Sequence, residues 1–317
     1  MQKPDRDLII VGGGSAGLTA AQYGARANLR TLLLEEVALG GQNLIIEGLE
    51  NYPGFPEPIS GFELAQRFEQ QAKNFGAEIL IASVKHIEKN NDLFKVETNS
   101  GVLTTYAVII ATGAKHRMLG VPGEKELAGK GVSYCATCDG PFFKNQKMLV
   151  VGGGDAACDE AMFLSKLTNK IIHIHRRDRF RAQKALAARV LHNPSIEVRF
   201  NTVLEQIHGK KNPMGIEKVH KVTLKELTTG KVYEEEVAAV FVFIGSDPNT
   251  GFIQSVEKDE AGYIITDQRM QTSIPGLFCA GDARATPFRQ IVVAAGEGAI
   301  AAHSAAQYID ELLGQAY

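Results

Sequence analysis

The feature that most constrains the fold of this chain is a β-α-β pattern that occurs twice. In the first copy, an apolar run at residues 8–11 leads into three glycines, residues 15–27 have helical periodicity, and the apolar run 31–34 ends on Glu35. The second copy repeats this order 140 residues further on. That spacing exceeds the period of about 20 to 50 residues typical of solenoid repeats. The pattern therefore predicts two nucleotide-binding units of the Rossmann type.

The segments around the second copy predict that one domain is inserted into the other. Short strands end in polar, proline-containing loops near residues 114–122 and 245–250. If these loops are the two crossings between domains, the C-terminal segment belongs with the first unit, and the crossings form a hinge that permits rotation. We therefore expect an α/β fold of two domains, with the segments 1–116 and 246–317 in one and 117–245 in the other.

Charge and hydropathy exclude several classes of protein. The 317 residues include 34 Lys and Arg against 36 Asp and Glu, so there is no excess of positive charge for binding nucleic acid or an anionic membrane. The longest apolar runs are far shorter than the roughly 18 residues of a membrane-spanning helix. The first seven residues include two acids and lead directly into an apolar run and a glycine turn, without the apolar core of a signal peptide. We expect a cytoplasmic protein.

The first glycine cluster has the spacing of a dinucleotide-binding turn. Gly12-x-Gly14-x-x-Gly17 lies between a predicted strand and a predicted helix, where glycines permit the turn and the close approach of a pyrophosphate. Glu35 follows 23 residues after Gly12. A carboxylate there can accept hydrogen bonds from ribose hydroxyls and would repel a 2′-phosphate. This site is expected to bind FAD or NAD.

The second glycine cluster predicts a different nucleotide. Gly152-x-Gly154-x-x-Ala157 is followed, 24 residues after Gly152, by Arg176, then Arg177 and Arg181. Guanidinium groups pair with phosphate in bidentate geometry, so arginines at the ribose end favour NADP over NAD. The alternative is a solvated basic turn. The coincidence with the ribose position favours phosphate binding.

Cys135-x-x-Cys138 can serve redox chemistry or metal binding. Zinc normally needs four ligands, and the remaining cysteines, Cys158 and Cys279, are single and have apolar neighbours, so zinc is the weaker alternative and no metal is expected. A CxxC pair can cycle between dithiol and disulfide. Asp139, next in sequence, could transfer protons as a general acid or base, or could simply be a turn residue.

Together these motifs resemble one family. The two glycine motifs, the string CATCDG, the string HRRxxFRA and the late segments Ala280-Gly281-Asp282 and Arg289-Gln290 occur in the order found in the low-molecular-weight bacterial thioredoxin reductases, which are pyridine nucleotide-disulfide oxidoreductases of class II. The resemblance spans nearly the whole chain. It implies a homodimer in which an FAD domain carries an inserted NADPH domain, both of the three-layer ββα type.

The resemblance also implies site residues, position by position. The reacting groups would be Cys135, Cys138 and Asp139, with Cys138 facing the flavin and Cys135 attacking the disulfide of thioredoxin. Residues expected to bind FAD are Gly12, Gly14, Ser15, Ala16, Gly17, Glu35, Glu36, Gly41, Gln42, Asn51, Gly113, Asp282, Arg289, Gln290 and Ile291. Residues expected to bind NADPH are Gly152, Gly154, Asp155, Ala156, His175, Arg176, Arg177 and Arg181.

Other functions remain open at the level of sequence. A related reductase could serve a glutaredoxin-like protein or a peroxidase, although no additional N-terminal thiol domain precedes the first glycine turn. A dithiol oxidase would pass electrons to oxygen without NADPH, which the arginines disfavour. A nucleotide-binding sensor could use the CxxC pair as a zinc or redox switch. The complete set of motifs favours the thioredoxin reductase, in which the NADPH domain rotates between half-reactions.

Overall fold

The computed structural model describes residues 3–46, 48–49, 51–211, 215 and 217–315. The chain forms two compact units. Unit 1 comprises Met1–Lys115 and Asp247–Tyr317, and unit 2 comprises His116–Ser246. The two connecting segments contain β7 (Ala114–His116) and β16 (Ser246–Pro248), which pair with each other as a two-stranded sheet. No helix among the described residues is long and apolar enough to cross a membrane.

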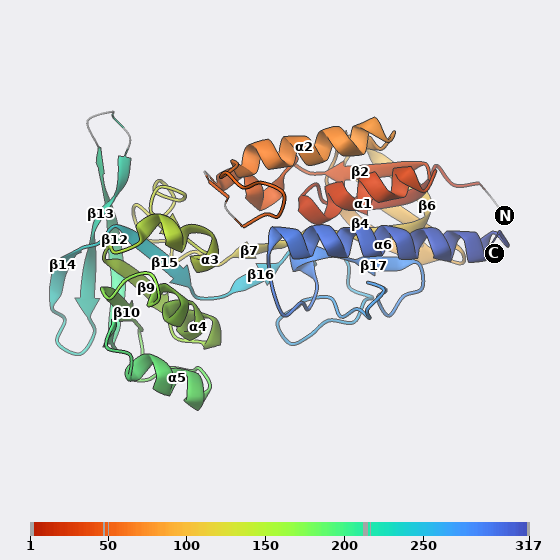
Figure 1. Cartoon of the computed structure of the whole chain (residues 1–317). Helices are drawn as coiled ribbons and strands as arrows, with labels where there is room; N and C mark the ends of the chain where they lie inside the picture. The colour runs from red at the N-terminus through yellow and green to blue at the C-terminus, as the bar shows by residue number, and fades with distance from the viewer. Residues whose placement is uncertain (1–2, 47, 50, 212–214, 216, 316–317) are drawn as a thin grey trace. The chain divides into compact units, whose positions relative to one another are not determined.

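Unit 1 is built on a sheet with the strand order β3-β2-β1-β6-β5-β4, in which β17 also pairs with β6 (Figure 1). Strands β3, β2, β1, β6 and β17 are parallel, whereas β4, β5 and the start of β6 form an antiparallel meander. The strands are β1 (Arg6–Val11), β2 (Thr31–Glu35), β3 (Glu78–Ile81), β4 (Val84–Asn90), β5 (Leu93–Thr98), β6 (Gly101–Ile110) and β17 (Leu277–Cys279).

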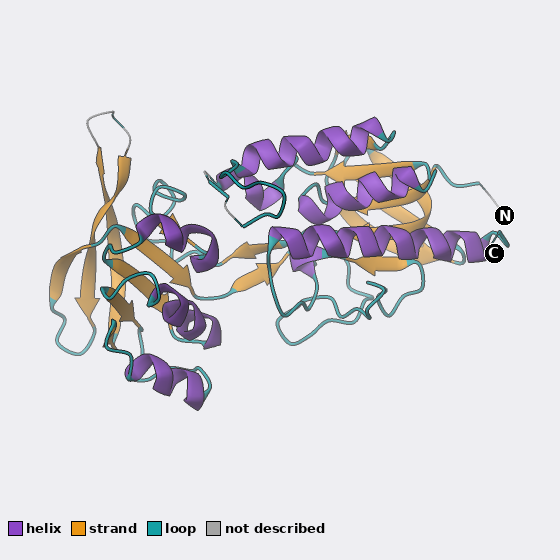
Figure 2. Ribbon diagram, viewed as in Figure 1, coloured by secondary structure: helices purple, strands orange, loops and turns teal. Residues whose placement is uncertain are grey.

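Helices α1 (Ser15–Arg26), α2 (Gly61–Asn74) and α6 (Ile291–Leu312) lie together on one face of this sheet (Figure 2). Alternate residues of the central strands face opposite layers, as the two-residue period of a strand requires. Leu8 and Ile10 pack into the core with the helices, whereas Ile9 and Val11 pack into a second core with β4, β5 and the segment 253–264. Both faces of the parallel sheet are therefore covered.

Helix α2 shows how local sequence sets one of these elements. The Ser60 hydroxyl accepts a hydrogen bond from the Glu63 backbone N–H at 3.1 Å, which caps the first turn. Leu64, Phe68 and Ala72 then recur at four-residue spacing and are buried against the sheet.

Unit 2 repeats the three-layer plan. A parallel sheet of order β11-β10-β9-β15-β8 carries helices on one face, and the antiparallel sheet β12-β13-β14 packs into the core on the other. The strands are β8 (Val132–Ser133), β9 (Met148–Gly152), β10 (Ile171–Ile174), β11 (Ile196–Arg199), β12 (Thr202–Lys211), β13 (Glu217–Glu226), β14 (Val232–Glu236) and β15 (Ala239–Phe243). The helices are α3 (Ala136–Asp139), α4 (Asp155–Leu164) and α5 (Lys184–Leu191).

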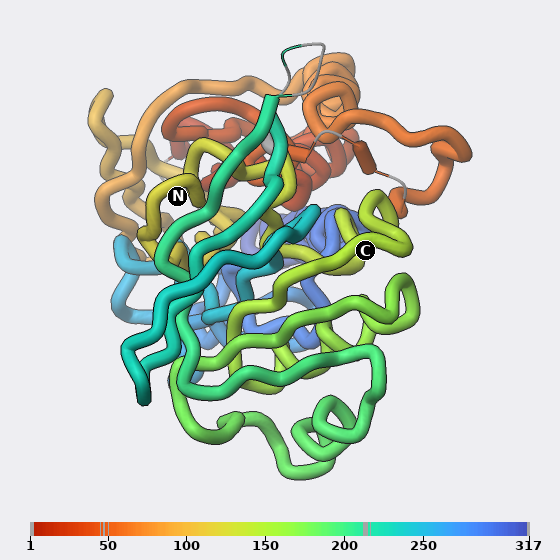
Figure 3. Tube along the Cα trace, turned by 90° about the vertical axis from the view of Figure 1, so that its left-hand side faces the viewer, coloured from red at the N-terminus to blue at the C-terminus, as the bar shows by residue number. Residues whose placement is uncertain are grey.

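The prediction of two Rossmann-like units with the three-layer ββα plan is confirmed. Helix α5 and strand β12, which forms the long hairpin with β13 (Figure 3), are among the elements that the sequence did not predict. The β-rich residues 79–87 are divided between β3 and β4. These two strands pair with different partners, because β3 is parallel to β2 whereas β4 is antiparallel to β5.

Candidate active site

The first glycine turn has the shape required for a bound pyrophosphate. Gly12 has φ +107°, and a Cβ there would lie 2.4 Å from the Ala111 carbonyl oxygen, so only glycine fits. A Cβ on Gly17 would lie 1.8 Å from the Gly12 carbonyl oxygen. At Gly14, in contrast, a Cβ would meet nothing within 4 Å, and no side chain caps the N-terminus of α1. The first amides of α1 therefore face open space, as an anion site at a helix N-terminus requires.

Glu35, at the end of β2, supports this turn directly. Its Oε2 accepts a hydrogen bond from the Gly13 N–H at 2.6 Å, and its Oε1 accepts one from the Val37 N–H at 3.0 Å. Glu36, next in sequence, is exposed. The remaining acceptor capacity of the Glu35 carboxylate is available for ribose hydroxyls.

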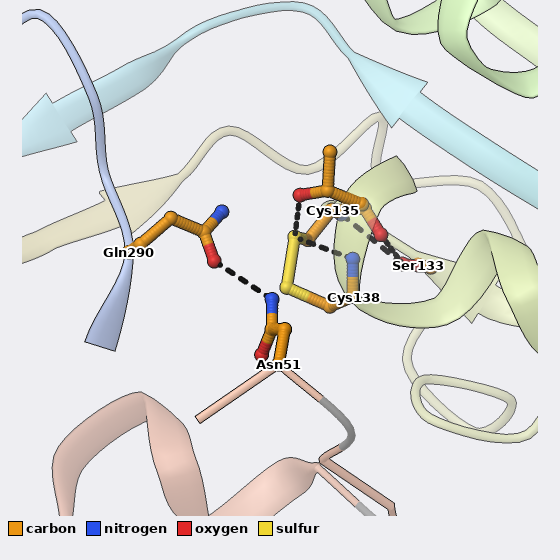
Figure 4. Close-up of a disulfide and its surroundings, with 6 residues drawn as sticks. Asn51, Ser133, Cys135, Cys138 and Gln290 are labelled. Carbon is orange, nitrogen blue, oxygen red and sulfur yellow. Dashed lines mark hydrogen bonds between the residues drawn. A yellow bond between two sulfur atoms is a disulfide. The ribbon is translucent and has the colours of Figure 1, made fainter. Parts of the chain in front are cut away.

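Several distant residues of the expected FAD site are brought together within unit 1. The Asn51 side chain donates a hydrogen bond to Gln290 Oε1 at 3.0 Å across 239 positions of sequence (Figure 4). Gln42, in the short helix η1 (Gly41–Ile45), donates to the Ala114 carbonyl. Gly113 has φ +66°, and a Cβ there would meet nothing within 4 Å.

The turn that carries Asp282 is held by a buried carboxylate. Glu297 Oε2 accepts the Gly281 N–H at 2.8 Å, and its Oε1 accepts from Arg284 and, at 3.2 Å, from the Thr286 hydroxyl. Burial raises the pKa of Asp282, the Glu297 charge acts in the same direction, and the cation of Arg289 opposes both.

Arg289 and Ile291 complete the expected FAD set. The Arg289 guanidinium lies 4.2 Å from the centre of the Tyr263 ring, which fixes its direction by a cation–π contact. Ile291 begins α6 and is half-buried. Sequence spacing gave no sign of Glu297, which lies inside the small-residue helix α6, or of Tyr263.

The second glycine turn, in unit 2, has the same construction. A Cβ on Gly152 would lie 2.4 Å from the Phe243 carbonyl oxygen, whereas a Cβ on Gly154 would meet nothing within 4 Å. No side chain caps α4. The ring of His175 packs against Gly153, where a Cβ would lie 2.3 Å from the imidazole. His175 follows Gly152 by 23 positions, as Glu35 follows Gly12, so the two side chains support equivalent turns.

The arginines that follow His175 in sequence form an electropositive edge. Burial lowers the pKa of His175, and the charges of Arg181, Arg177 and Arg176 lower it further, which keeps the imidazole neutral. The three arginines are exposed, and among the described residues none has an ion pair with a carboxylate. Their guanidiniums are therefore available for a phosphate.

Asp155 has a structural partner that the sequence did not indicate. Its Oδ1 accepts the Gln183 backbone N–H at 2.7 Å and its Oδ2 accepts from the Gln183 amide at 3.3 Å. The carboxylate thereby ties the start of α4 to the residue before α5. Asp155 and Ala156 form the first turn of α4, where their backbone N–H groups are not used by the helix.

Cys135 and Cys138 form a disulfide at the start of α3, in unit 2 (Figure 4). Cys135 Sγ accepts hydrogen bonds from the Cys138 N–H at 3.2 Å and from the Thr137 hydroxyl at 3.4 Å. The Ser133 hydroxyl donates to the Cys135 carbonyl at 3.2 Å and accepts its N–H at 3.1 Å. Cys135 and Cys138 are both half-buried residues.

Asp139 lies beside the disulfide in sequence, whereas the two remaining cysteines are buried and take no part in it. The Asp139 N–H donates to the Cys135 carbonyl at 3.2 Å, and the side chain is half-buried. Cys158 and Cys279 are free and buried; burial raises the pKa of the Cys158 thiol to about 11 and raises that of Cys279 as well, so both are unreactive. Over the described part of the chain, no group of three or more His, Cys, Asp or Glu is arranged for a metal ion.

Two dinucleotide-type turns and a redox-active CxxC define a nucleotide-dependent disulfide oxidoreductase, and comparison with known proteins agrees. The family model described as pyridine nucleotide-disulphide oxidoreductase matches residues 6–298. A thioredoxin reductase of Treponema pallidum is 54% identical over 97% of this chain and 98% of its own length, and one of Bacillus subtilis is 44% identical over 96% and 95%.

Solved structures agree as well. The thioredoxin reductase of Streptococcus pyogenes is 43% identical, with a TM-score of 0.91 over 96% of this chain and 98% of that one. The Lactococcus lactis thioredoxin reductase, described in the FR conformation, is 42% identical with a TM-score of 0.66 over 97% and 100%. The chain belongs to the pyridine nucleotide-disulphide oxidoreductase family, as a low-molecular-weight thioredoxin reductase.

Membership in this family makes the protein an NADPH-dependent flavoprotein whose cofactors are FAD and NADPH. The residues described above fit both groups. Each glycine turn leaves the space beside Gly14 or Gly154 open next to unused helix amides, and the acid at one ribose end and the arginines at the other match the two nucleotides.

Proposed function

We propose that the chain reduces the disulfide of thioredoxin at the expense of NADPH, by way of its Cys135–Cys138 pair. The observation that carries this proposal is the half-buried disulfide, held at the start of α3 in the unit that also carries the arginine-lined glycine turn. The names of the relatives support thioredoxin as the substrate.

The cofactors would be held by separate domains. FAD would occupy the domain of residues 1–116 and 246–317, with its pyrophosphate on the first glycine turn and its ribose on Glu35. NADPH would occupy the domain of residues 117–245, with its 2′-phosphate on Arg176, Arg177 and Arg181. When bound, the two cofactors supply the hydride equivalent that reduces the Cys135–Cys138 disulfide to a dithiol.

The dithiol then passes two electrons to thioredoxin by thiol–disulfide exchange. The Cys135 thiolate attacks one sulfur of the thioredoxin disulfide, which forms a mixed disulfide and releases a thiolate of thioredoxin. Cys138 attacks Cys135 Sγ, which restores the enzyme disulfide and releases the second thiolate. In this proposal Asp139, the residue after Cys138, receives the proton that Cys138 loses, and solvent protonates the products.

The hydrogen bonds around the disulfide support Cys135 as the attacking sulfur. Two donors, the Cys138 N–H and the Thr137 hydroxyl, lie within hydrogen-bond distance of Cys135 Sγ. Donors stabilise a thiolate more strongly than a thiol, because the acceptor then carries a full charge. Cys138 is left as the sulfur that faces the flavin, as the family resemblance implies.

Unit 2 must present both its nicotinamide site and its dithiol to one flavin, and we propose that it rotates about the two crossings between half-reactions. The paired strands β7 and β16 are suited to such a hinge because each crossing is a single short segment. We further propose that the enzyme is a cytoplasmic homodimer that binds neither nucleic acid nor membrane. The near-neutral charge disfavours binding to nucleic acid or an anionic membrane, and the CxxC pair is typical of a reducing compartment. The homodimer is what the family resemblance implies.

The test is NADPH oxidation by the FAD-loaded protein with and without oxidised thioredoxin, alongside NADH as donor. We expect thioredoxin-dependent oxidation of NADPH, weak activity with NADH, and complete loss of turnover in Cys138→Ser. The matched control Cys158→Ser, which changes a buried unreactive thiol, should keep turnover.

Two other outcomes would redirect the proposal. If NADPH bleached the flavin but thioredoxin added no turnover, the acceptor would have to be another disulfide protein. If NADPH failed to reduce the flavin, the assignment of the arginines would be wrong and an oxidase would become the better description.

A further inference from the structure

Unit 2 contains a buried carboxylate that the reaction described above does not use. Glu124 is 1% exposed. Its Oε1 accepts the Leu119 N–H at 3.0 Å, and its Oε2 accepts the Gly120 N–H at 2.7 Å. A carboxylate buried away from water is tolerated only where hydrogen-bond donors satisfy its oxygens. Here the first two donors belong to the segment that follows the first crossing from unit 1.

The third donor comes from the residue that precedes the reactive disulfide. The Tyr134 hydroxyl donates to Glu124 Oε1 at 3.1 Å. Burial raises the pKa of Tyr134, and the neighbouring Glu124 charge raises it further, so the phenol stays protonated and remains a donor. The ring of Tyr134 also stacks on His116, with centroids 5.3 Å apart and planes 7° from parallel. His116 is the last residue of β7, at the crossing itself.

We propose that Glu124 is a positioning residue that joins the crossing segment, residues 116–120, to the redox-active turn at Cys135. The carboxylate holds the backbone of that segment on one side and Tyr134 on the other, and the His116–Tyr134 stack makes a second connection.

These contacts connect a movement of the crossing segment to Cys135. Tyr134 is bonded to Cys135, whose N–H and carbonyl are both held by the Ser133 hydroxyl. A change of backbone angles at the crossing is therefore transmitted to Cys135 through the hydrogen bonds of Glu124 and the stacked rings. This inference rests on the proposed role of the Cys135–Cys138 pair, but the contacts that carry it do not depend on the identity of the substrate.

The test is amide hydrogen exchange, read by mass spectrometry, on the oxidised FAD-loaded enzyme. Tyr134→Phe removes one hydroxyl and keeps the ring, and we expect exchange at residues 119–120 to speed up about tenfold although neither residue is changed. Glu124→Gln replaces an acceptor by a donor and is expected to speed exchange at residues 135–139 by a similar factor. The control Glu126→Gln makes the same change at an exposed position two residues away and should alter neither segment. Tyr233→Phe is the matched control for loss of a phenol hydroxyl.

Turnover supplies a second readout. We expect both variants to lower kcat with thioredoxin several-fold and to leave KM for NADPH unchanged, because the three arginines take no part in the contacts of Glu124. The double variant should be no slower than Glu124→Gln alone, since the two residues act through one contact.

Three outcomes would overturn the proposal. Exchange confined to residues 119–120 in both variants would make Glu124 a purely local support. Equal acceleration throughout unit 2 would show lost fold stability. Unchanged kcat would show that the connection has no part in turnover. A wild-type enzyme that did not reduce thioredoxin would instead refute the proposed function. The exchange experiment would still test whether Glu124 joins the crossing segment to the turn at Cys135.

Discussion

The hydroxyl of Thr137 offers the sharpest test of how this protein activates a sulfur. It lies 3.4 Å from Cys135 Sγ, beside the Cys138 N–H at 3.2 Å. Thr137→Val removes this donor and keeps the shape of the side chain. A hydrogen bond to a charged group contributes about 1.5 to 3 kcal/mol, and a half-buried site with a sulfur acceptor belongs at the lower end. About 1.4 kcal/mol corresponds to one pKa unit, so we expect the variant to raise the pKa of the Cys135 thiol by about one unit.

The assay is the rate of alkylation of Cys135 by iodoacetamide as a function of pH, in a Cys138→Ser background that leaves one reactive thiol. The alkylation midpoint should move up by about one unit in Thr137→Val, and the rate below the midpoint should fall by up to about tenfold because only the thiolate reacts. Thr137→Ser, which restores a hydroxyl, should return the midpoint to its original position. An unchanged midpoint in Thr137→Val would refute the view that this hydroxyl stabilises the attacking thiolate.

Three further perturbations test other parts of the structure. Arg181→Ala should raise KM for NADPH about tenfold or more and leave KM for NADH unchanged in steady-state assays, because only NADPH carries the phosphate. Gly12→Ala should destabilise even the FAD-free protein in thermal unfolding, whereas Gly14→Ala, whose Cβ meets open space, should keep that stability and lower the FAD content measured by absorbance. Burial raises the pKa of Glu160 to about 7 from 4.5, so stability conferred by its neutral form is present below pH 4.5 and lost as pH rises to 7. Glu160→Gln should therefore raise the melting temperature at pH 8 and have little effect at pH 4.5.

Local signals were sufficient to predict the two β-α-β units. The apolar run at residues 8–11 and the helical periodicity after Gly14 are properties of neighbouring residues, and the turns are marked by glycines at positions such as Gly12 where no other residue fits. The same holds for the Cys135–Cys138 pair, where a separation of three residues places the Cα atoms 5.4 Å apart. Cys158 and Cys279, whose sequence neighbours are apolar, are buried, as such a local context indicates.

Contacts between distant residues could not be predicted in this way. Strand β12 contains Gln206 and His208 among its apolar residues and is interrupted by two irregularities in register, so its alternation is weak in the sequence. Glu124 occurs in a charged stretch that resembles a solvated turn, and only the fold brings Tyr134 to it. Asp155 likewise is held by Gln183, 28 residues away.

The residue run Glu234-Glu235-Glu236, which belongs to none of the sequence motifs, illustrates the same limit. It lies in the edge strand β14, where Glu235 forms ion pairs with Lys147 at 2.7 Å and Arg199 at 2.9 Å. Neither partner is near it in sequence. These ion pairs depend on the assembled fold, because Lys147 directly precedes β9 and Arg199 is the last residue of β11.

The equivalence of Glu35 and His175 limits how nucleotide preference can change. Each stands 23 residues after the first glycine of its turn, and each is fitted to the middle glycine, Glu35 by a hydrogen bond to Gly13 and His175 by ring packing against Gly153. An exchange of acid for base at either position would therefore disturb the loop that carries the pyrophosphate. Redesign of either unit for the other nucleotide would have to begin with the exposed position that follows, Glu36 in unit 1 and Arg176 in unit 2, and evolution faces the same restriction.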